Sequence, residues 1–271
     1  MGLSLGQTTV YPDGYNPSLL FPISRPVNRK LLGISGDLPF YGQDTWHHYE
    51  VSWLKPNGIP EAVIAKIILP CESEFLIESK SMKLYFNSLN MEKFESREVL
   101  RKLVEQDLSQ AAQAKIQVKF FDLSENLNFS FGKLAGESLD NLSVKISDYH
   151  VNSGLLKLKN PEINITKETL STQLFRSLCP VTSQPDWAGI CINYSGPQLC
   201  REGLLAYLIS YRTHLGFHED CVERIFMDLK NLADFKELTV MGYFTRRGGL
   251  DINPVRTTNP NIPEIIRLFR Q

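Results

Sequence analysis

The chain has 271 residues, 42% hydrophobic and 22% charged, a composition typical of a globular protein with one large domain or two modules. Its formal net charge of -1 gives no electrostatic signature of binding to nucleic acid or to an anionic membrane. No segment reaches about 18 apolar residues, and the N-terminus lacks a basic region followed by an apolar run, so we expect a cytoplasmic protein. The 5 cysteines are widely spaced without a CxxC pair, which predicts free thiols rather than disulfides or a zinc site.

The first half of the chain predicts an arm, a hairpin, a long strand and a helix. Residues 1–45 are rich in Gly, Pro and Asn and predict an extended arm. Two apolar strands at 48–54 and 62–69, separated by a Pro-Asn-Gly turn, predict a hairpin. Residues 75–88 alternate apolar and polar side chains in their second part and predict a bent strand. Ser96 precedes a helical apolar spacing that continues to Ala112.

After two further predicted strands at 115–123 and 141–147, the second half repeats this order. Residues 187–194 predict a strand, 204–211 a long strand and 219–232 a helix, and two strands follow at 238–245 and 250–255. Residues 204–211 match residues 82–89, with Leu204 opposite Met82 and Tyr207 opposite Tyr85. The common order indicates an internal duplication and an α+β fold of two modules, each with an antiparallel sheet covered by helices. We assign the arm to 1–45, the first module to 46–160 and the second to 161–271.

A cysteine and an aspartate flank one loop of the second half. Cys179 follows an apolar run, and the prolines and polar residues after it end the strand, so the thiol lies where a strand becomes a loop. Asp186 opens the next apolar segment and can return to the sulfur. A nucleophile and a proton donor in one loop are suited to covalent catalysis. The alternative interpretation is that Cys179 is an ordinary buried thiol without a catalytic role.

Three further polar positions allow both a functional and a structural interpretation. Glu78 interrupts an apolar run and needs a ligand or partner if it is buried, or it lies at a surface edge. Glu219 begins a helix, where it can accept hydrogen bonds from a ligand or only cap the helix. The Arg246-Arg247-Gly248-Gly249 turn suits a phosphate or is only a turn. GxGxxG, Walker A and HExxH motifs are absent, which excludes the common nucleotide and zinc sites.

Four motifs together carry a family resemblance. The segments 178–187 (LCPVTSQPDW), 78–85 (ESKSMKLY), 217–221 (FHEDC) and 245–249 (TRRGG) resemble the NADPH-dependent 7-cyano-7-deazaguanine reductases of queuosine biosynthesis, in their long two-module form. The resemblance implies two tandem tunnelling-fold (T-fold) modules and a homodimer or higher homo-oligomer. It implies no metal, and it implies NADPH as the co-substrate, two per turnover.

The resemblance also implies a role for each motif position. The nitrile of 7-cyano-7-deazaguanine would undergo a four-electron reduction to an aminomethyl group through a covalent cysteine thioimide. Cys179 corresponds to the nucleophile and Asp186 to the acid. The implied substrate contacts are Ile77, Glu78, Ser79, His218 and Glu219, and the implied NADPH contacts are Ser79, Lys80, Arg247 and Gly248.

Two alternatives remain open at this point. A cyclohydrolase-like enzyme of the same fold would need metal ligands that the sequence does not offer as a cluster. A non-catalytic T-fold protein that binds a purine or pterin would need the pocket but not the thiol.

Overall fold

The computed structural model describes residues 14–124, 131–159 and 165–271. Residues 1–13 of the predicted arm, and the predicted module boundary at 160/161, lie outside these ranges. The elements of the first half are η1 (Pro17–Leu19), β1 (Pro22–Ser24), α1 (Arg25–Leu31), β2 (Tyr41–Leu54), β3 (Pro60–Pro70), β4 (Phe75–Ile77), α2 (Ser79–Ser88), α3 (Arg97–Ala112) and β5 (Gln117–Asp122).

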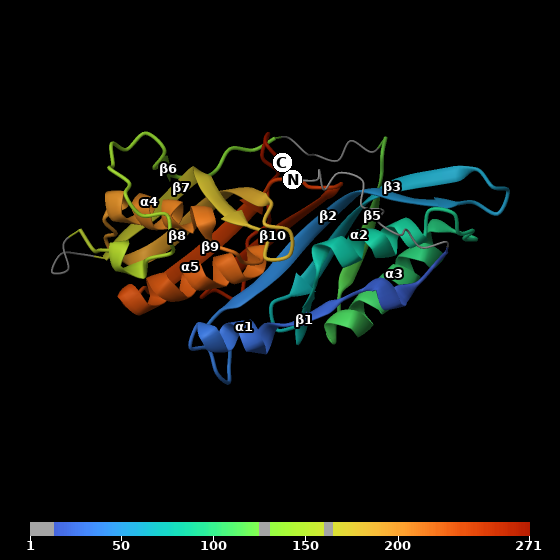
Figure 1. Cartoon of the computed structure of the whole chain (residues 1–271), viewed down its shortest axis with the longest axis horizontal. Coiled ribbons are helices and arrows are strands. Elements are labelled where there is room, and N and C mark those ends of the chain that lie inside the picture. Colours follow the sequence, from blue (N-terminus) through green and yellow to red (C-terminus); the bar gives the residue numbers. More distant parts are fainter. Residues whose placement is uncertain (1–13, 125–130, 160–164) are drawn as a thin grey trace, which may run out of the picture.

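The second half repeats the series of a hairpin, two helices and a strand. Its elements are β6 (Glu137–Ser138), η2 (Ser153–Leu155), β7 (Ile165–Leu178), β8 (Pro185–Pro197), α4 (Arg201–Ile209), η3 (Ser210–Thr213), α5 (His218–Leu232), β9 (Glu237–Phe244) and β10 (Leu250–Thr257). The two halves lie side by side along the long axis, with α2 and α3 over the first and α4 and α5 over the second (Figure 1).

The strands of both halves form one continuous sheet. Its order is β5-β3-β2-β10-β9-β8-β7-β6, and β1 and β4 form a separate pair. The halves join where β2 pairs with β10 in antiparallel register, from Tyr41 opposite Thr257 to His48 opposite Leu250. The structure is therefore α+β with a largely antiparallel sheet, as the sequence predicts at this coarse level.

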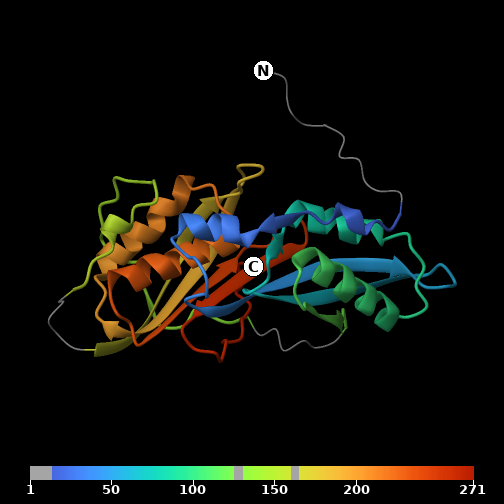
Figure 2. The same ribbon diagram turned by 90° about the horizontal axis from the view of Figure 1, so that it is seen from below.

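The helices of both halves cover the same face of the sheet. Asp44 and Trp46 are two residues apart on β2 and so point to one face. Trp46 packs in the apolar cluster with residues of α2 and α3, while Asp44 joins a buried ionic cluster with Glu223 of α5. Figure 2 shows the green α3 and the orange α5 in front of the strands. The opposite face carries the C-terminal segment, whose Leu268 packs on strands β8 and β9.

Two segments predicted as strands are helices. In residues 75–88 only Phe75–Ile77 is a strand, and α2 follows because the Glu78 carboxylate accepts hydrogen bonds from the backbone N–H groups of Lys80 and Ser81. Met82, Tyr85 and Phe86 are fully buried at helical spacing. Residues 204–211 are likewise α4 and η3, so the predicted repeat pairs two helices rather than two strands.

The strand predicted at 141–147 is also absent, since these residues have no regular secondary structure. Leu142 and Val144 still pack against the second-half core, which accounts for the alternation in sequence. The arm predicted at 1–45 is not simply extended, since its described part contains helix α1 and the first five residues of β2. The predictions confirmed with changes of bounds are the hairpin β2–β3, helix α3, strands β5, β8, β9 and β10, and helix α5. All five cysteines are free.

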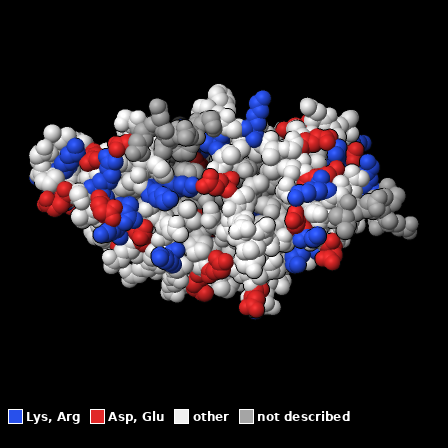
Figure 3. Space-filling model, turned by 180° about the vertical axis from the view of Figure 1, so that it is seen from behind, with Lys and Arg blue, Asp and Glu red and all other residues white. Residues whose placement is uncertain are grey.

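The surface carries both signs of charge. Figure 3 shows positive and negative side chains interspersed over one face, without a basic stripe of the kind that follows a nucleic-acid backbone. Across the described ranges, every helix is too short or too polar to cross a membrane.

A buried ionic cluster lies where the two halves meet. The Asp44 carboxylate on β2 contacts Arg25 of α1 at 2.5 Å and Arg256 of β10 at 2.8 Å. Arg256 also contacts Glu223 of α5 at 2.8 Å, and Arg29 contacts the same carboxylate at 2.7 Å. Each of these five side chains is at most 7% exposed. The cluster therefore ties α1, β2, β10 and α5 together.

Arg256→Met is expected to destabilise the protein by about 3–5 kcal/mol, because it leaves Asp44 and Glu223 buried with fewer cations. Arg97→Met is the control, since Arg97 also pairs with two carboxylates but is 34% exposed, and its loss is expected to cost about 1 kcal/mol or less. Urea unfolding measures both. Equal losses for the two variants would contradict a special role for the buried cluster.

Candidate active site

The loop between β7 and β8 brings Cys179 and Asp186 to the same end of one hairpin. The Cys179 N–H donates to the Gln184 carbonyl at 2.8 Å, and the Ser183 N–H donates to the Cys179 carbonyl at 2.9 Å. Ser183 takes a left-handed conformation, φ 58°, which closes the loop. Cys179 directly follows the last residue of β7, as the sequence predicts.

Both side chains line a narrow cavity between the halves. Its volume is about 20 Å³, about that of one water. Among the residues predicted for the site, the cavity is lined by Ile77, Ser79, Cys179, Asp186, His218, Glu219 and Arg247. The sequence analysis assigned no role to the other lining residues, which are Pro180, Gly216, Phe217 and Ile252.

The surroundings of Cys179 favour its thiolate. The thiol is 4% exposed, and burial alone would raise its pKa. Hydrogen bonds from the Thr182 hydroxyl, the Arg247 guanidinium and the backbone N–H groups of Thr182 and Val181 outweigh burial and lower the pKa below its ordinary value. Cys179 is thus a stronger candidate nucleophile than the other buried cysteines, since burial raises the pKa of Cys71 to about 12 and that of Cys191 to about 11.

Asp186 lies between a histidine and an arginine. His218 Nε2 is 3.3 Å from one carboxylate oxygen, and the Arg247 guanidinium is 3.3 Å from the other. The His218 ring stacks on Phe244, with centroids 3.8 Å apart and an angle of 5° between the planes. Its Nδ1 is buried without a hydrogen-bond partner among the described residues. The stack fixes the ring so that Nε2 faces Asp186.

Glu219 is a buried acid with an unused oxygen. It is the second residue of α5 and 2% exposed, and its Oε1 has no hydrogen-bond partner in the part of the chain that the structure describes. Burial and the nearby Asp44 charge raise the pKa of this carboxyl to about 8. An unsatisfied polar atom in a cavity wall is costly to the fold and is suited to a ligand with N–H donors.

Glu78, Lys80 and Gly248 do not line the cavity. Both Glu78 oxygens accept backbone hydrogen bonds, at 2.9 Å from Lys80 N and 2.7 Å from Ser81 N. Glu78 therefore fixes the start of α2, whose first residue is Ser79. Lys80 is exposed, and Gly248 lies in a turn with a left-handed φ of 61°.

Lys83 lies near the cavity without lining it, and the sequence analysis did not assign it a role. Burial and then the Arg247 charge lower its pKa, and it interacts electrostatically with Asp186 and Cys179. It lies four residues after Ser79, one turn along α2, and therefore on the same helix face. Recognising residues 79–88 as a helix would have placed Lys83 near the cavity.

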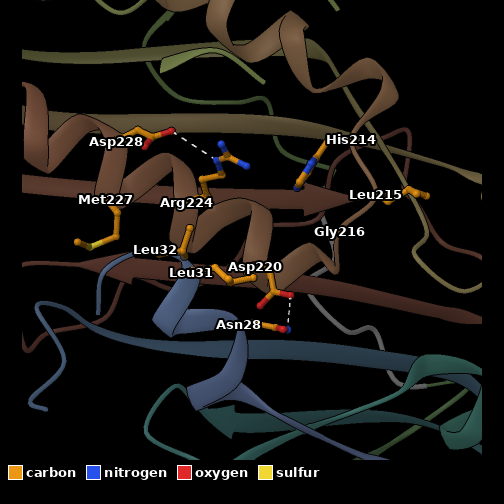
Figure 4. A pocket seen from close by; sticks show the side chains of 10 residues that line it. All are labelled: Asn28, Leu31, Leu32, His214, Leu215, Gly216, Asp220, Arg224, Met227 and Asp228. Atoms are coloured by element: carbon orange, nitrogen blue, oxygen red, sulfur yellow. Dashed lines mark hydrogen bonds and ion pairs between the residues drawn. The ribbon is translucent and has the colours of Figure 1, made fainter. Parts of the chain in front are cut away.

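A second cavity adjoins the first at Gly216, which is the one residue that lines both. It is larger, about 320 Å³, and lies between α1, the segment 214–216 and α5 (Figure 4). The Asn28 amide donates to Asp220 across it at 2.8 Å, and Arg224 is 3.8 Å from Asp228. None of the residues predicted for the site lines this cavity.

Among the described residues, no group of three or more His, Cys, Asp or Glu side chains is placed to hold a metal ion. Fold and site together define an α+β protein with a cysteine and a carboxyl group in a shared, mostly buried cavity. Such a site is suited to nucleophilic chemistry without a metal in its wall.

Comparison with known proteins gives the family. Residues 11–120 match the family described as nitrile reductase, 7-cyano-7-deazaguanine-reductase N-term, and residues 185–261 match that of QueF-like proteins. The chain is 48% identical over 267 residues to the NADPH-dependent 7-cyano-7-deazaguanine reductase of Xanthomonas campestris pv. campestris (strain B100), covering 98% of this chain and 96% of the relative. It is 45% identical over 272 residues to the protein of that name from Desulfotalea psychrophila, covering 100% and 98%.

The chain therefore belongs to the NADPH-dependent 7-cyano-7-deazaguanine reductase family, which confirms the resemblance seen in the motifs. The relatives match almost from end to end, so the match includes both halves of the chain.

Glu219→Gln is expected to stabilise the fold by an amount that grows with pH. Between about pH 4.5 and 8 the unfolded chain has lost the Glu219 proton while the folded protein keeps it, which favours unfolding of the wild type. The glutamine variant lacks this effect, so the difference in free energy of unfolding between the variant and the wild type should rise by at most about 1.4 kcal/mol per pH unit in this range. Urea unfolding at pH 5 and pH 8.5 measures it, and a difference that does not change with pH would contradict a protonated, buried Glu219.

Proposed function

We propose that this protein catalyses the NADPH-dependent four-electron reduction of the nitrile of 7-cyano-7-deazaguanine to 7-aminomethyl-7-deazaguanine, a step of queuosine biosynthesis. The observation that carries the proposal is the placement of Cys179, Asp186 and Glu219 around one cavity, in a chain 48% identical to a reductase of this name over 98% of its length.

Cys179 is the nucleophile in this proposal. A nitrile is a weak electrophile, so its attack requires a thiolate and a proton source. The Cys179 sulfur bonds to the nitrile carbon, and the nitrogen takes a proton, which gives a covalent thioimide. Hydrogen bonds from Thr182 and Arg247, which favour the thiolate, support this role.

Asp186 is the acid that protonates the nitrile nitrogen. It lies on the strand that leaves the Cys179 loop, and His218 is within 3.3 Å to orient it or to exchange a proton. In the complete reaction two hydrides add to the carbon, two protons add to the nitrogen, and the carbon–sulfur bond breaks to return Cys179. NADPH supplies the hydrides.

Substrate recognition falls to groups on both halves of the chain. A deazaguanine presents an N–H and an exocyclic amine side by side, and the unused Glu219 oxygen supports an assignment of this group as their acceptor once the bound substrate has favoured its ionised form. Ile77, Ser79 and His218 line the same cavity and complete the proposed contacts. Glu78 is also proposed as a substrate contact: each of its oxygens accepts one backbone hydrogen bond from the start of α2, and a carboxylate oxygen can accept a second.

The NADPH contacts proposed from the motifs are Ser79, Lys80, Arg247 and Gly248. Lys80 and Arg247 supply positive charge, which suits phosphate groups, and Lys83 adds a third cation beside Arg247. Gly248 packs against Lys83: a Cβ at this position would be 3.3 Å from the lysine side chain. The residues present therefore fit an anionic cofactor.

At the level of the fold we propose two tandem T-fold modules, spanning 46–160 and 161–271 after an arm of 1–45. The repeated series of a hairpin, two helices and a strand supports this division. We further propose a homodimer or a higher homo-oligomer, which the family resemblance implies.

The first test is to mix the protein with nitrile alone and measure intact mass. The expected result is an adduct of one substrate mass that disappears in Cys179→Ala and persists in Cys200→Ala, the control at a partly exposed thiol. An adduct that persists in Cys179→Ala would show that another residue is the nucleophile. Loss of NADPH absorbance with 7-cyano-7-deazaguanine tests the activity as a whole, and no turnover at any pH would refute it.

Asp186→Asn is expected to lower the turnover number by about 10²- to 10⁴-fold, because the amide cannot supply the proton. Asp228→Asn is the matched control, a carboxyl in the neighbouring cavity that accepts a hydrogen bond from Tyr207. Steady-state NADPH oxidation measures both variants. Wild-type turnover in Asp186→Asn would remove its role as the acid.

A further inference from the structure

Arg247 contacts Asp186 and the loop that carries Cys179. One of its terminal nitrogens donates to the Gln184 side chain at 2.7 Å and lies 3.5 Å from the Thr182 hydroxyl, and the other is 3.3 Å from Asp186. Arg247 and Cys179 also line the same narrow cavity. All these groups belong to the loop and strand that carry the nucleophile, so Arg247 is directed back toward the 179–186 segment.

The other charged groups around Cys179 have different contacts. Lys83 acts on the sulfur through space, His218 faces Asp186, and Glu219 is buried in the wall of the cavity. Arg247 thus combines a full positive charge with direct hydrogen bonds to the loop that carries the thiol. An opposite charge within a few ångström is a strong stabiliser of an ionised group.

The same guanidinium is also a proposed contact of the cofactor. While Cys179 is a thiolate, Arg247 is held by the sulfur and by Asp186. After the sulfur bonds to the nitrile carbon it carries no charge, and its electrostatic attraction for Arg247 falls. A side chain 31% exposed at the edge of the cavity then has room to meet an anion from outside.

We propose that Arg247 serves two anions in turn: it holds Cys179 as a thiolate in the free enzyme, and it binds a cofactor phosphate once the sulfur is bonded to substrate. The second half rests on the proposed function, while the first depends only on the contacts of Arg247. Arg247 is accordingly a positioning residue for the nucleophile. Because both anions use the same guanidinium, a cofactor that binds before the substrate makes ionisation of the Cys179 thiol less favourable.

Alkylation of Cys179 by iodoacetamide tests the first half without substrate. The rate is followed from pH 5.5 to 9.5 by the mass of the Cys179 peptide in the full chain. Arg247→Gln is expected to move the midpoint of the profile up by about one pH unit and to slow alkylation at pH 6.5 by up to about tenfold. Arg247→Lys should recover part of this, since it keeps the charge with fewer donors.

Arg246→Gln is the matched control, because Arg246 is the neighbouring residue but stacks on Tyr49, 4.6 Å from the ring, away from the thiol. It should retain the wild-type profile. An unchanged profile in Arg247→Gln would overturn the proposal whether or not the protein turns over nitrile. An equal shift in both arginine variants would assign the effect to overall charge and would also overturn it.

The oxidised cofactor NADP⁺, which cannot donate a hydride, tests the second half. At saturation it is expected to move the wild-type midpoint upward and to leave that of Arg247→Gln in place. A uniform drop in rate at every pH would indicate simple shielding and would refute the alternating use of Arg247. Failure of NADP⁺ to bind both the free enzyme and the nitrile adduct, measured by calorimetry, would refute the cofactor half together with the proposed cofactor site, while the alkylation of Arg247→Gln would still decide the first half.

Discussion

The buried cluster of Arg25, Arg29 and Arg256 with Asp44 and Glu223 is the constraint on which the site depends. Unpaired charges cannot be buried at acceptable cost, so each of these side chains fixes the position of the others. The cluster joins helix α1, the central strands β2 and β10, and helix α5. Glu219 lies one turn before Glu223 on α5, so the same contacts that join the halves also hold Glu219 at the cavity.

The site is composite for a geometric reason. The second half supplies the thiol, the carboxyl groups and the histidine, but the cavity wall is closed by Ile77 and Ser79, which the first half places through the start of α2. Such a wall exists only because β2 and β10 join the sheets edge to edge. The proposed chemistry needs a nucleophile, an acid, recognition of the base and a hydride donor in one place, and it therefore draws on segments more than a hundred residues apart.

Much of this could be predicted from the sequence where signals are local. The thiol at a strand end, the β2–β3 hairpin and the capped helix α3 follow from turn residues, a cap and periodicity. Helices α2 and α4 were missed because short apolar runs fit the helical and the strand periodicity equally well. Met82, Tyr85 and Phe86 can be recognised as one helix face only once the core in which they are buried is known. Arg256 and Asp44 could not be predicted as buried, since nothing in a strand pattern shows which charges will meet.

Glu78 and Glu219 illustrate how the same residue type takes opposite roles. Both lie at the start of a helix, where free N–H groups attract a carboxylate. Glu78 precedes its helix, and each of its oxygens accepts a backbone hydrogen bond, so it stabilises the helix and fixes where the helix starts. Glu219 lies within the first turn of its helix, buried with one oxygen unused, so it costs stability. A buried carboxyl without a hydrogen-bond partner destabilises a fold, and it is retained where a bound ligand supplies the missing hydrogen bonds. The unsatisfied carboxyl of Glu219 is therefore the stronger indication of function.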